Sequence, residues 1–148
     1  MNMSGEQLIK APRAQVWTAL NDPQILERCI PGCERLEKVC DHRLSATVVA
    51  KVGPVKARFS GEVEFEDIKP LEGYRLNGKG QGGIAGFAQA GAVVTLVDAP
   101  EGTILSYDVQ AVVGGKLAQI GARLIDSTAK KLADQFFSNF GAVFVTQD

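Results

Sequence analysis

The stretch from Val55 to Glu66 reads VKARFSGEVEFE and alternates apolar and polar residues without a break. Successive side chains of a β-strand point to opposite faces, so this period of two predicts a strand with one face in a core and the other in water. The segment therefore predicts a half-buried antiparallel strand near the middle of the chain.

The same period extends in both directions from this segment. Residues 34–52, which precede it, also have alternating apolar positions. Gly53-Pro54 marks the turn between this stretch and the strand that begins at Val55. Three more strands are expected over 74–81, 86–98 and 103–113, with turns at 70–73 and 99–102. An earlier strand is expected from Met3 to Lys10.

Helical patterns flank this run of strands. Pro12 is well placed as a first helical residue, and two short helices are expected before Pro31-Gly32. After Gly114-Gly115 the period becomes 3.6, which predicts one helix of about six turns from Leu117 to Phe140.

A run of hairpin-connected strands followed by one long helix indicates an α+β domain, a single one spanning residues 1–148. A sheet can cover a long amphipathic helix only if it curves, and glycines within strands allow bends and bulges. We therefore expect a curved antiparallel sheet wrapped around the C-terminal helix, with an apolar space between them. The glycines in or beside strands are Gly53, Gly61, Gly78, Gly80, Gly82, Gly83, Gly86 and Gly91.

Composition excludes several classes of function. The formal net charge is −1 and the sequence contains no basic run interleaved with aromatic residues, which is the pattern expected of nucleic-acid binding. The N-terminus lacks the charged and apolar regions of a signal peptide, and no stretch is apolar enough to span a membrane. A cytoplasmic protein is expected, with at most peripheral contact at the inner face of the cell membrane.

Two apparent ligand motifs are set aside. Residues 78–83 match the dinucleotide fingerprint G-x-G-x-x-G, but a strand pattern follows them where that fingerprint requires a helix. Cys29, Cys33, Cys40 and His42 lie close together, but Cys40 and His42 are spaced too tightly for an ordinary zinc site. We expect no metal site, with Cys29 and Cys33 as small apolar residues and His42 in an exposed turn.

Catalytic groups are sparse. His42 is the one histidine of the sequence, and the nucleophile elbow G-x-S-x-G is absent. Glu62 and Glu64 are expected on the solvated face of their strand. Tyr107 and Asp108 should point to opposite faces, which leaves the Tyr107 hydroxyl as a polar anchor inside an apolar space.

Taken together, five segments resemble the carbon monoxide dehydrogenase G-subunit family, of the START-like, Bet v 1-like (SRPBCC) superfamily. The resemblance extends from about Met1 to Phe140. The segments are residues 29–34 (CIPGCE), 50–56 (AKVGPVK), 82–87 (GGIAGF), 113–125 (VGGKLAQIGARLI) and 130–137 (KKLADQFF).

The resemblance implies a helix-grip fold with an apolar cavity between sheet and helix, without an intrinsic cofactor but accepting a quinone or other lipid. It also implies a non-catalytic accessory protein of a molybdenum hydroxylase of the carbon monoxide dehydrogenase type, acting in membrane recruitment or electron relay. Some family members continue into a hydrophobic C-terminal anchor, whereas this sequence ends at Asp148, so stable anchoring is not expected.

Three hypotheses follow: a carrier of a hydrophobic small molecule, an assembly or interaction module without a ligand, and an enzyme such as a cyclase or hydrolase acting on a hydrophobic substrate. For the carrier, a Leu124→Trp substitution is expected to fill the cavity and weaken binding. Strand parity and helix phase predict the lining residues as Ile30, Phe59, Phe87, Tyr107, Leu117, Ile120 and Leu124.

Overall fold

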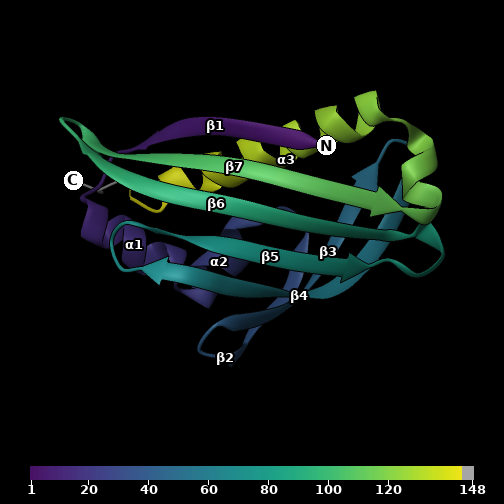
Figure 1. Cartoon of the computed structure of the whole chain (residues 1–148), viewed down its shortest axis with the longest axis horizontal. Helices are drawn as coiled ribbons and strands as arrows, with labels where there is room; N and C mark the ends of the chain where they lie inside the picture. Colours follow the sequence, from purple (N-terminus) through teal and green to yellow (C-terminus); the bar gives the residue numbers. More distant parts are fainter. Residues whose placement is uncertain (145–148) are drawn as a thin grey trace.

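Seven antiparallel strands form one sheet in the order β1-β7-β6-β5-β4-β3-β2, as shown by the computed structural model (Figure 1). The model describes residues 1–144, so the last four residues of the predicted domain lie outside the described residues. The strands are β1 (Asn2–Ile9), β2 (Cys33–Cys40), β3 (Arg43–Val52), β4 (Val55–Lys69), β5 (Gly73–Gln81), β6 (Phe87–Ala99) and β7 (Gly102–Gly114). The helices are α1 (Arg13–Leu20), α2 (Pro23–Cys29) and α3 (Ala122–Ala142), with 3₁₀ turns η1 (Gly83–Ala85) and η2 (Gly115–Ile120).

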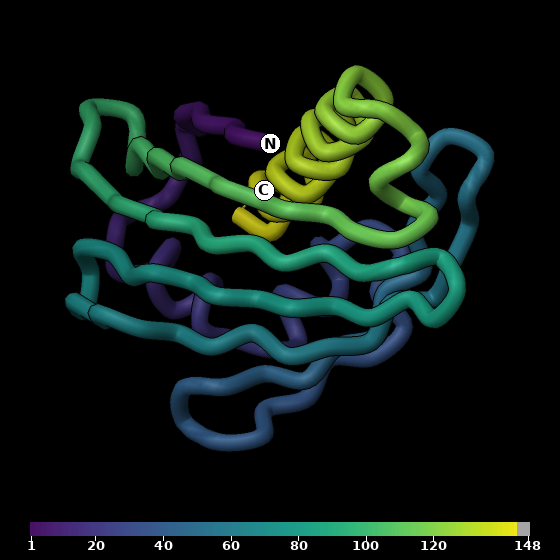
Figure 2. Tube along the Cα trace, turned by 45° about the vertical axis from the view of Figure 1, so that its right-hand side comes forward, coloured from purple at the N-terminus to yellow at the C-terminus, as the bar shows by residue number. Residues whose placement is uncertain are grey.

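All three α-helices lie on one side of this curved sheet (Figures 1 and 2). Local chemistry fixes the short ones: the Asp22 carboxylate accepts a hydrogen bond from the Gln24 amide at 2.9 Å, and Pro23 starts α2. The Asn139 side-chain amide donates to the Cys29 carbonyl oxygen at 3.0 Å, which ties α3 to the end of α2. The predicted α+β class, with two short helices after the first strand and a run of antiparallel strands before the long helix, is confirmed.

The predicted long helix is wrong at its N-terminus. Leu117 and Ile120 lie in η2, and the α-helix begins at Ala122. Gly121 has a φ of 103°, outside the α-helical region, and it interrupts the helical run at this point. Leu117, Ile120 and Leu124 therefore do not form one helical stripe.

Residues 78–83 lead from β5 through η1 directly into β6, so the helix that the dinucleotide fingerprint requires after the motif does not follow it. Gly61 of the neighbouring strand β4 has a structural role. A Cβ atom there would collide with the carbonyl oxygen of Lys79 on β5, so glycine permits the close approach of β4 and β5.

The buried core occupies one end of the space between sheet and helices. Phe140 of α3 and Val16 of α1 have 0% exposure, and Leu105 of β7 has 1%. Thr103 is also fully buried, and its hydroxyl donates to the Ala11 carbonyl oxygen at 2.8 Å. This end is packed by large side chains, which distinguishes it from the opposite end.

Candidate functional site

The sheet-facing side of α3 changes character along the helix. Its C-terminal half carries Phe136, Phe137 and Phe140, which pack on one another with ring centroids 5.1 and 5.7 Å apart. Its N-terminal half presents the smaller residues Thr128 and Ala129 between the aliphatic Ile125 and Leu132, and all four remain half-buried. The helix therefore fills the interior at one end and leaves it less filled at the other.

The sheet shows the same change at the same end. Inward-facing positions opposite the N-terminal half of α3 are mostly alanine or glycine, and the larger side chains among them are only half-buried: Val48, Phe59, Val63, Val109 and Val113. Inward side chains of a filled core would be fully buried. The small inward residues, placed by strand alternation, are Ala46, Ala50, Ala57, Gly61, Gly78, Gly80, Ala88, Ala90, Ala92 and Ala111.

Three segments border this less filled end, and together we call them the rim: residues 51–56, 81–87 and 114–124. They contact one another, because a Cβ atom at Gly53 would lie 3.3 Å from Ile120 and 3.4 Å from Leu124, and one at Gly115 would lie 2.8 Å from the Cα of Gly86. Figures 1 and 2 show the three segments together at the end of the sheet where β5 and β7 finish.

Four predicted lining residues are found at this end or along its border. Leu117 is buried at 4% exposure, whereas Ile30, Phe59 and Ile120 are half-buried. Ile30 ends α2 beside β3, where the Val49 amide donates to the Gly32 carbonyl oxygen at 2.9 Å.

Leu124 lies at the rim rather than in the interior between sheet and helix. Its exposed fraction is 45%, and its side chain reaches the β3–β4 turn. A tryptophan at this position would obstruct the rim rather than fill the interior, so Ala129 is the better position for a filling substitution. Tyr107 points inward, as predicted. Its ring packs in the aromatic half against Phe137, and its hydroxyl lies over Gly5 of β1.

Phe87 lies on the opposite side of the sheet from the other predicted residues. It pairs with Gly114 across β6 and β7, and its ring covers that glycine. Strand alternation places Phe87 with the exposed Gln89 and Val93, whereas Val94 on the other face is buried. The structure therefore does not bring Phe87 together with the interior residues.

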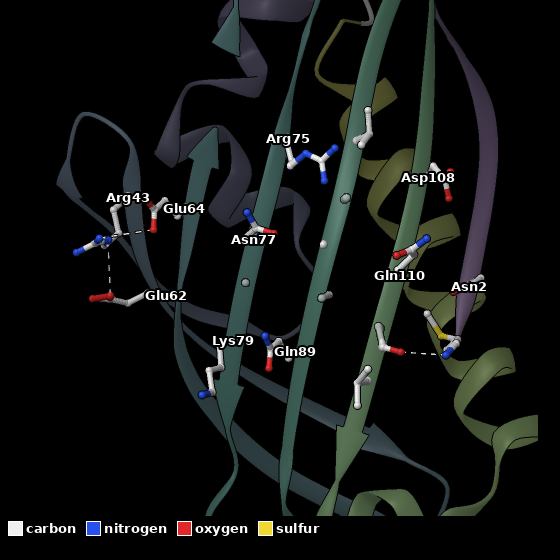
Figure 3. A pocket seen from close by; sticks show the side chains of 18 residues that line it. Asn2, Arg43, Glu62, Glu64, Arg75, Asn77, Lys79, Gln89, Asp108 and Gln110 are labelled. Carbon is white, nitrogen blue, oxygen red and sulfur yellow. Dashed lines mark hydrogen bonds and ion pairs between the residues drawn. The ribbon is translucent and has the colours of Figure 1, made fainter. Parts of the chain in front are cut away.

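A second concave surface lies on the outer face of the sheet, away from α3 (Figure 3). This open hollow has a volume of about 1110 Å³. Its polar lining does not suit an apolar ligand, and sequence reasoning treated two of its residues, Glu62 and Glu64, only as a solvated face. The signal that could have found it is the set of polar residues at matching outward positions on neighbouring strands. The labelled lining residues are Asn2, Arg43, Glu62, Glu64, Arg75, Asn77, Lys79, Gln89, Asp108 and Gln110.

Arg43 of the outer hollow is paired with two acidic residues across the β3–β4 strand pair. Arg43 lies 3.9 Å from Glu62 and 3.6 Å from Glu64, and all three side chains are about half exposed. Such exposed pairs contribute little to stability. Asp108 lines this surface while Tyr107 faces the core, which confirms that the two side chains point apart.

Among the described residues, no group of three or more His, Cys, Asp or Glu side chains is placed to hold a metal ion. Cys29 is buried, Cys33 is half-buried and Cys40 is exposed, as is His42 in its turn. Burial raises the pKa of the Cys29 and Cys33 thiols, and it raises the pKa of the Tyr74 hydroxyl strongly. No carboxylate within residues 1–144 is buried, so a buried acid that could act catalytically is missing from that part of the chain.

Solved structures share this architecture. A conserved protein from Geobacillus kaustophilus matches with a TM-score of 0.89 and 36% identity, covering 96% of this chain and 93% of its own. A protein from Chromobacterium violaceum gives 0.72 and 17%, covering 99% and 98%. Ara h 8.0201, a Bet v 1-like protein, gives 0.67 and 12%, covering 97% and 96%. Among curated protein sequences, none matches significantly.

The curved sheet, the C-terminal helix and the interior between them define a helix-grip domain with a Bet v 1-like fold. The chain belongs to the CoxG family, the G-subunit family of carbon monoxide dehydrogenase, whose model matches residues 5–144. Members of this family are accessory rather than catalytic subunits, and the family name implies association with carbon monoxide dehydrogenase. Within the described residues, no helix combines the length and apolarity needed to cross a membrane.

Proposed function

We propose that this protein carries an apolar small molecule, a quinone or another lipid, between the sheet and α3. We further propose that it does so as a cytoplasmic, non-catalytic accessory protein of a molybdenum hydroxylase of the carbon monoxide dehydrogenase type. In that role it helps to recruit the hydroxylase to the membrane or relays its electrons. The bound molecule would supply the redox chemistry, and the protein would supply binding and orientation.

The observation that carries the proposal is the uneven filling of the interior. Large aromatic side chains pack around Phe140, whereas the walls at the rim end consist mostly of alanine, glycine and threonine interspersed with half-buried larger apolar side chains. Small residues on both walls leave space that larger side chains would otherwise occupy, and apolar walls favour an apolar occupant.

Two features fit a quinone in particular. The apolar walls at the rim end suit a flat ring and its aliphatic tail, with Phe59 among the aromatic residues available for contact. The Tyr107 hydroxyl forms no hydrogen bond within the described part of the chain, and a quinone that extended from the rim end to the edge of the aromatic half would offer it a carbonyl oxygen.

The first test is native mass spectrometry of protein purified from its own host, followed by organic extraction and identification of the released molecule. A stoichiometric quinone or other lipid supports the carrier. A ligand-free mass, together with no uptake of added decylubiquinone, would contradict it and favour an assembly module without a ligand.

Two tryptophan substitutions on α3 locate the site. Ala129→Trp adds a large ring at a half-buried position facing the sheet, and we expect it to weaken decylubiquinone binding at least tenfold by calorimetry. Ser138→Trp places the same ring on the exposed side of the helix and should leave the affinity unchanged. Thermal unfolding monitored by circular dichroism checks that both variants fold. Equal affinity in the two variants would mean that the ligand lies elsewhere.

A further inference from the structure

The outward face of β6 is an uncharged strip through the outer surface of the sheet. It lies opposite the buried side chains of Val94 and Leu96, and it exposes Val93 and Val97 by 39% and 57%. Val112 of the neighbouring β7 is 66% exposed on the same face. Exposed aliphatic side chains without charges among them are a feature of surfaces that meet another protein. The outward residues of β6 are Phe87, Gln89, Gly91, Val93, Thr95, Val97 and Ala99.

Charges of opposite sign lie on the two sides of this strip (Figure 3). The outward charges of β5 are Arg75 and Lys79, whereas that of β7 is Asp108. Arg75 and Asp108 are both direct partners of Val93, so one row across the sheet carries a cation, a valine and a carboxylate. Within the described residues Lys79 and Asp108 form no ion pair, and Arg75 meets only the exposed Asp67, at 3.7 Å.

This arrangement of charges is complementary to itself. A two-fold axis parallel to β6 and above the outer face brings β6 of two copies together and sets β5 of each copy over β7 of the other. Arg75 of one copy then faces Asp108 of the second, and Asn77 faces Gln110, because the members of each pair share a row of the sheet. Since the outward side chains of β6 are uncharged, no charge faces its own copy on the axis. An axis across the strands would instead place Arg75 over Lys79, so the charges favour the axis parallel to β6.

Gly91 lies at the centre of this face, although the fold of one copy does not require a glycine there. Its φ is not positive, and a Cβ atom would touch only the Asn77 side-chain oxygen at 3.3 Å and the Leu76 carbonyl oxygen at 3.8 Å. A glycine inside a strand weakens the strand and often marks the close approach of another backbone. In the two-fold arrangement the Gly91 residues of the two copies face each other, so their missing side chains let the sheets approach.

We propose that the protein forms a homodimer through the outer faces of its sheets, packed face to face about a two-fold axis parallel to β6. Aligned sheets pack about 10 Å apart, and the outer hollow of each copy receives long polar side chains of the other, such as Gln110. Water bridges the polar groups that stay apart. α3 lies on the other side of the sheet, so the ligand space of each copy stays accessible, and the dimer does not rest on the carrier function.

Sedimentation velocity of the whole protein tests the dimer. At low ionic strength and concentrations up to about 1 mM, we expect a species of twice the 15.8 kDa of one chain, with a dissociation constant that rises with added salt. Arg75→Asp and Asp108→Arg each place like charges opposite each other at two symmetric positions. Each should therefore raise the dissociation constant at least about tenfold.

The two charge variants should associate with each other although neither associates with itself. In an equimolar mixture, both symmetric positions again bring a carboxylate opposite a guanidinium group. The double variant Arg75→Asp with Asp108→Arg exchanges both charges and should dimerise like the wild type. Matched controls on α3, Arg123→Asp and Asp134→Arg, make the same exchanges at exposed positions on the other side of the sheet and should leave the association unchanged.

Gly91→Val separates the dimer from the stability of each copy. In dilute protein it should keep or raise the melting temperature, because a valine suits a strand, yet it should raise the dissociation constant at least about tenfold by holding the sheets apart. Circular dichroism checks that every variant folds. Wild-type protein that stays monomeric, a dimer that the single charge variants leave intact, or a mixture of the two that does not associate overturns the proposal.

Discussion

Tyr107 of β7 and Phe137 of α3 stack with ring centroids 5.2 Å apart and an angle of 19° between their planes. This contact lies in the aromatic half of the interior. It joins β7, the last strand along the chain, to the long helix α3. Tyr107 also covers Gly5 of β1, so one side chain links β1, β7 and α3.

Phe137→Ala should reduce the free energy of unfolding by about 2–3 kcal/mol, less than for a fully buried phenylalanine because Phe137 is half-buried. Tyr107→Phe keeps the stacked ring and should change stability by less than about 0.5 kcal/mol. Urea unfolding measures both. A loss in Tyr107→Phe as large as that in Phe137→Ala would mean that the hydroxyl, rather than the ring, stabilises the contact.

Gly121 and Gly141 provide a pair of opposite predictions. A Cβ atom would meet nothing within 4 Å at either position, but Gly121 has a φ of 103° and Gly141 lies within α3. Gly121→Ala should therefore destabilise the protein by about 1–2 kcal/mol through backbone strain. Gly141→Ala should stabilise it by about 0.5–1 kcal/mol through helix propensity. Thermal unfolding measures both changes. Melting temperatures that shift in the same direction in the two variants would contradict the conformational argument.

Phe59 and Phe87 separate the two faces of the sheet. The ring of Phe59 lies against Gly82 on the inner side, and the ring of Phe87 covers Gly114 on the outer side. Each substitution by alanine should cost about 1–3 kcal/mol of stability, because each ring is half-buried. Only Phe59→Ala should also weaken decylubiquinone binding, by at least fivefold in calorimetry. A loss of binding in Phe87→Ala alone would place the ligand on the outer face.

Glu34 and Arg58 give a prediction of pH dependence. The Arg58 guanidinium donates to the Glu34 carboxylate at 2.6 and 3.2 Å, and this hydrogen bonding lowers the pKa of Glu34 below its ordinary value of 4.5. Since the pKa is lowered in the folded state, the contribution of this pair to stability is present above about pH 4.5 and is lost as the pH falls through the folded value.

Carbon-13 NMR titration of the Glu34 carboxyl measures that pKa. In Arg58→Gln it should return towards the ordinary value, and in the wild type it should rise with added salt because both side chains are exposed. Arg75→Gln, which removes a cation elsewhere on the sheet, should leave it unchanged. An unaltered pKa in Arg58→Gln would show that a group other than Arg58 lowers the pKa of Glu34.

Most of the fold could be predicted because the strands alternate so regularly. Segments such as 55–66 carry charged residues at nearly every outward position, which fixes the face of each inward residue. The start of α3 could not be predicted in the same way. Leu117, Ile120 and Leu124 follow helical spacing, and the interruption comes from the φ of Gly121, which spacing does not reveal.

The candidate site was harder to predict for a related reason. Phe87 begins a segment in which one face carries Ala88 and Ala90 and the other carries Gln89 and Gly91. Small residues on both faces give little contrast in polarity, so the inward face of β6 is not evident until Val94 and Leu96 become buried. The outer hollow was missed because it depends on how several strands curve together, which no single strand encodes.

The pairing of β1 with β7 has a consequence for synthesis of the protein. Asn2 is opposite Gln110 and Ile9 is opposite Thr103, so β1 leaves the ribosome well before its partner, which follows only as the sixth strand after it. Contacts so distant along the chain close slowly. Until residues 102–114 emerge, Leu8 and Ile9 remain on an unpaired strand edge, where a nascent chain is most prone to aggregate and where a chaperone would be expected to bind.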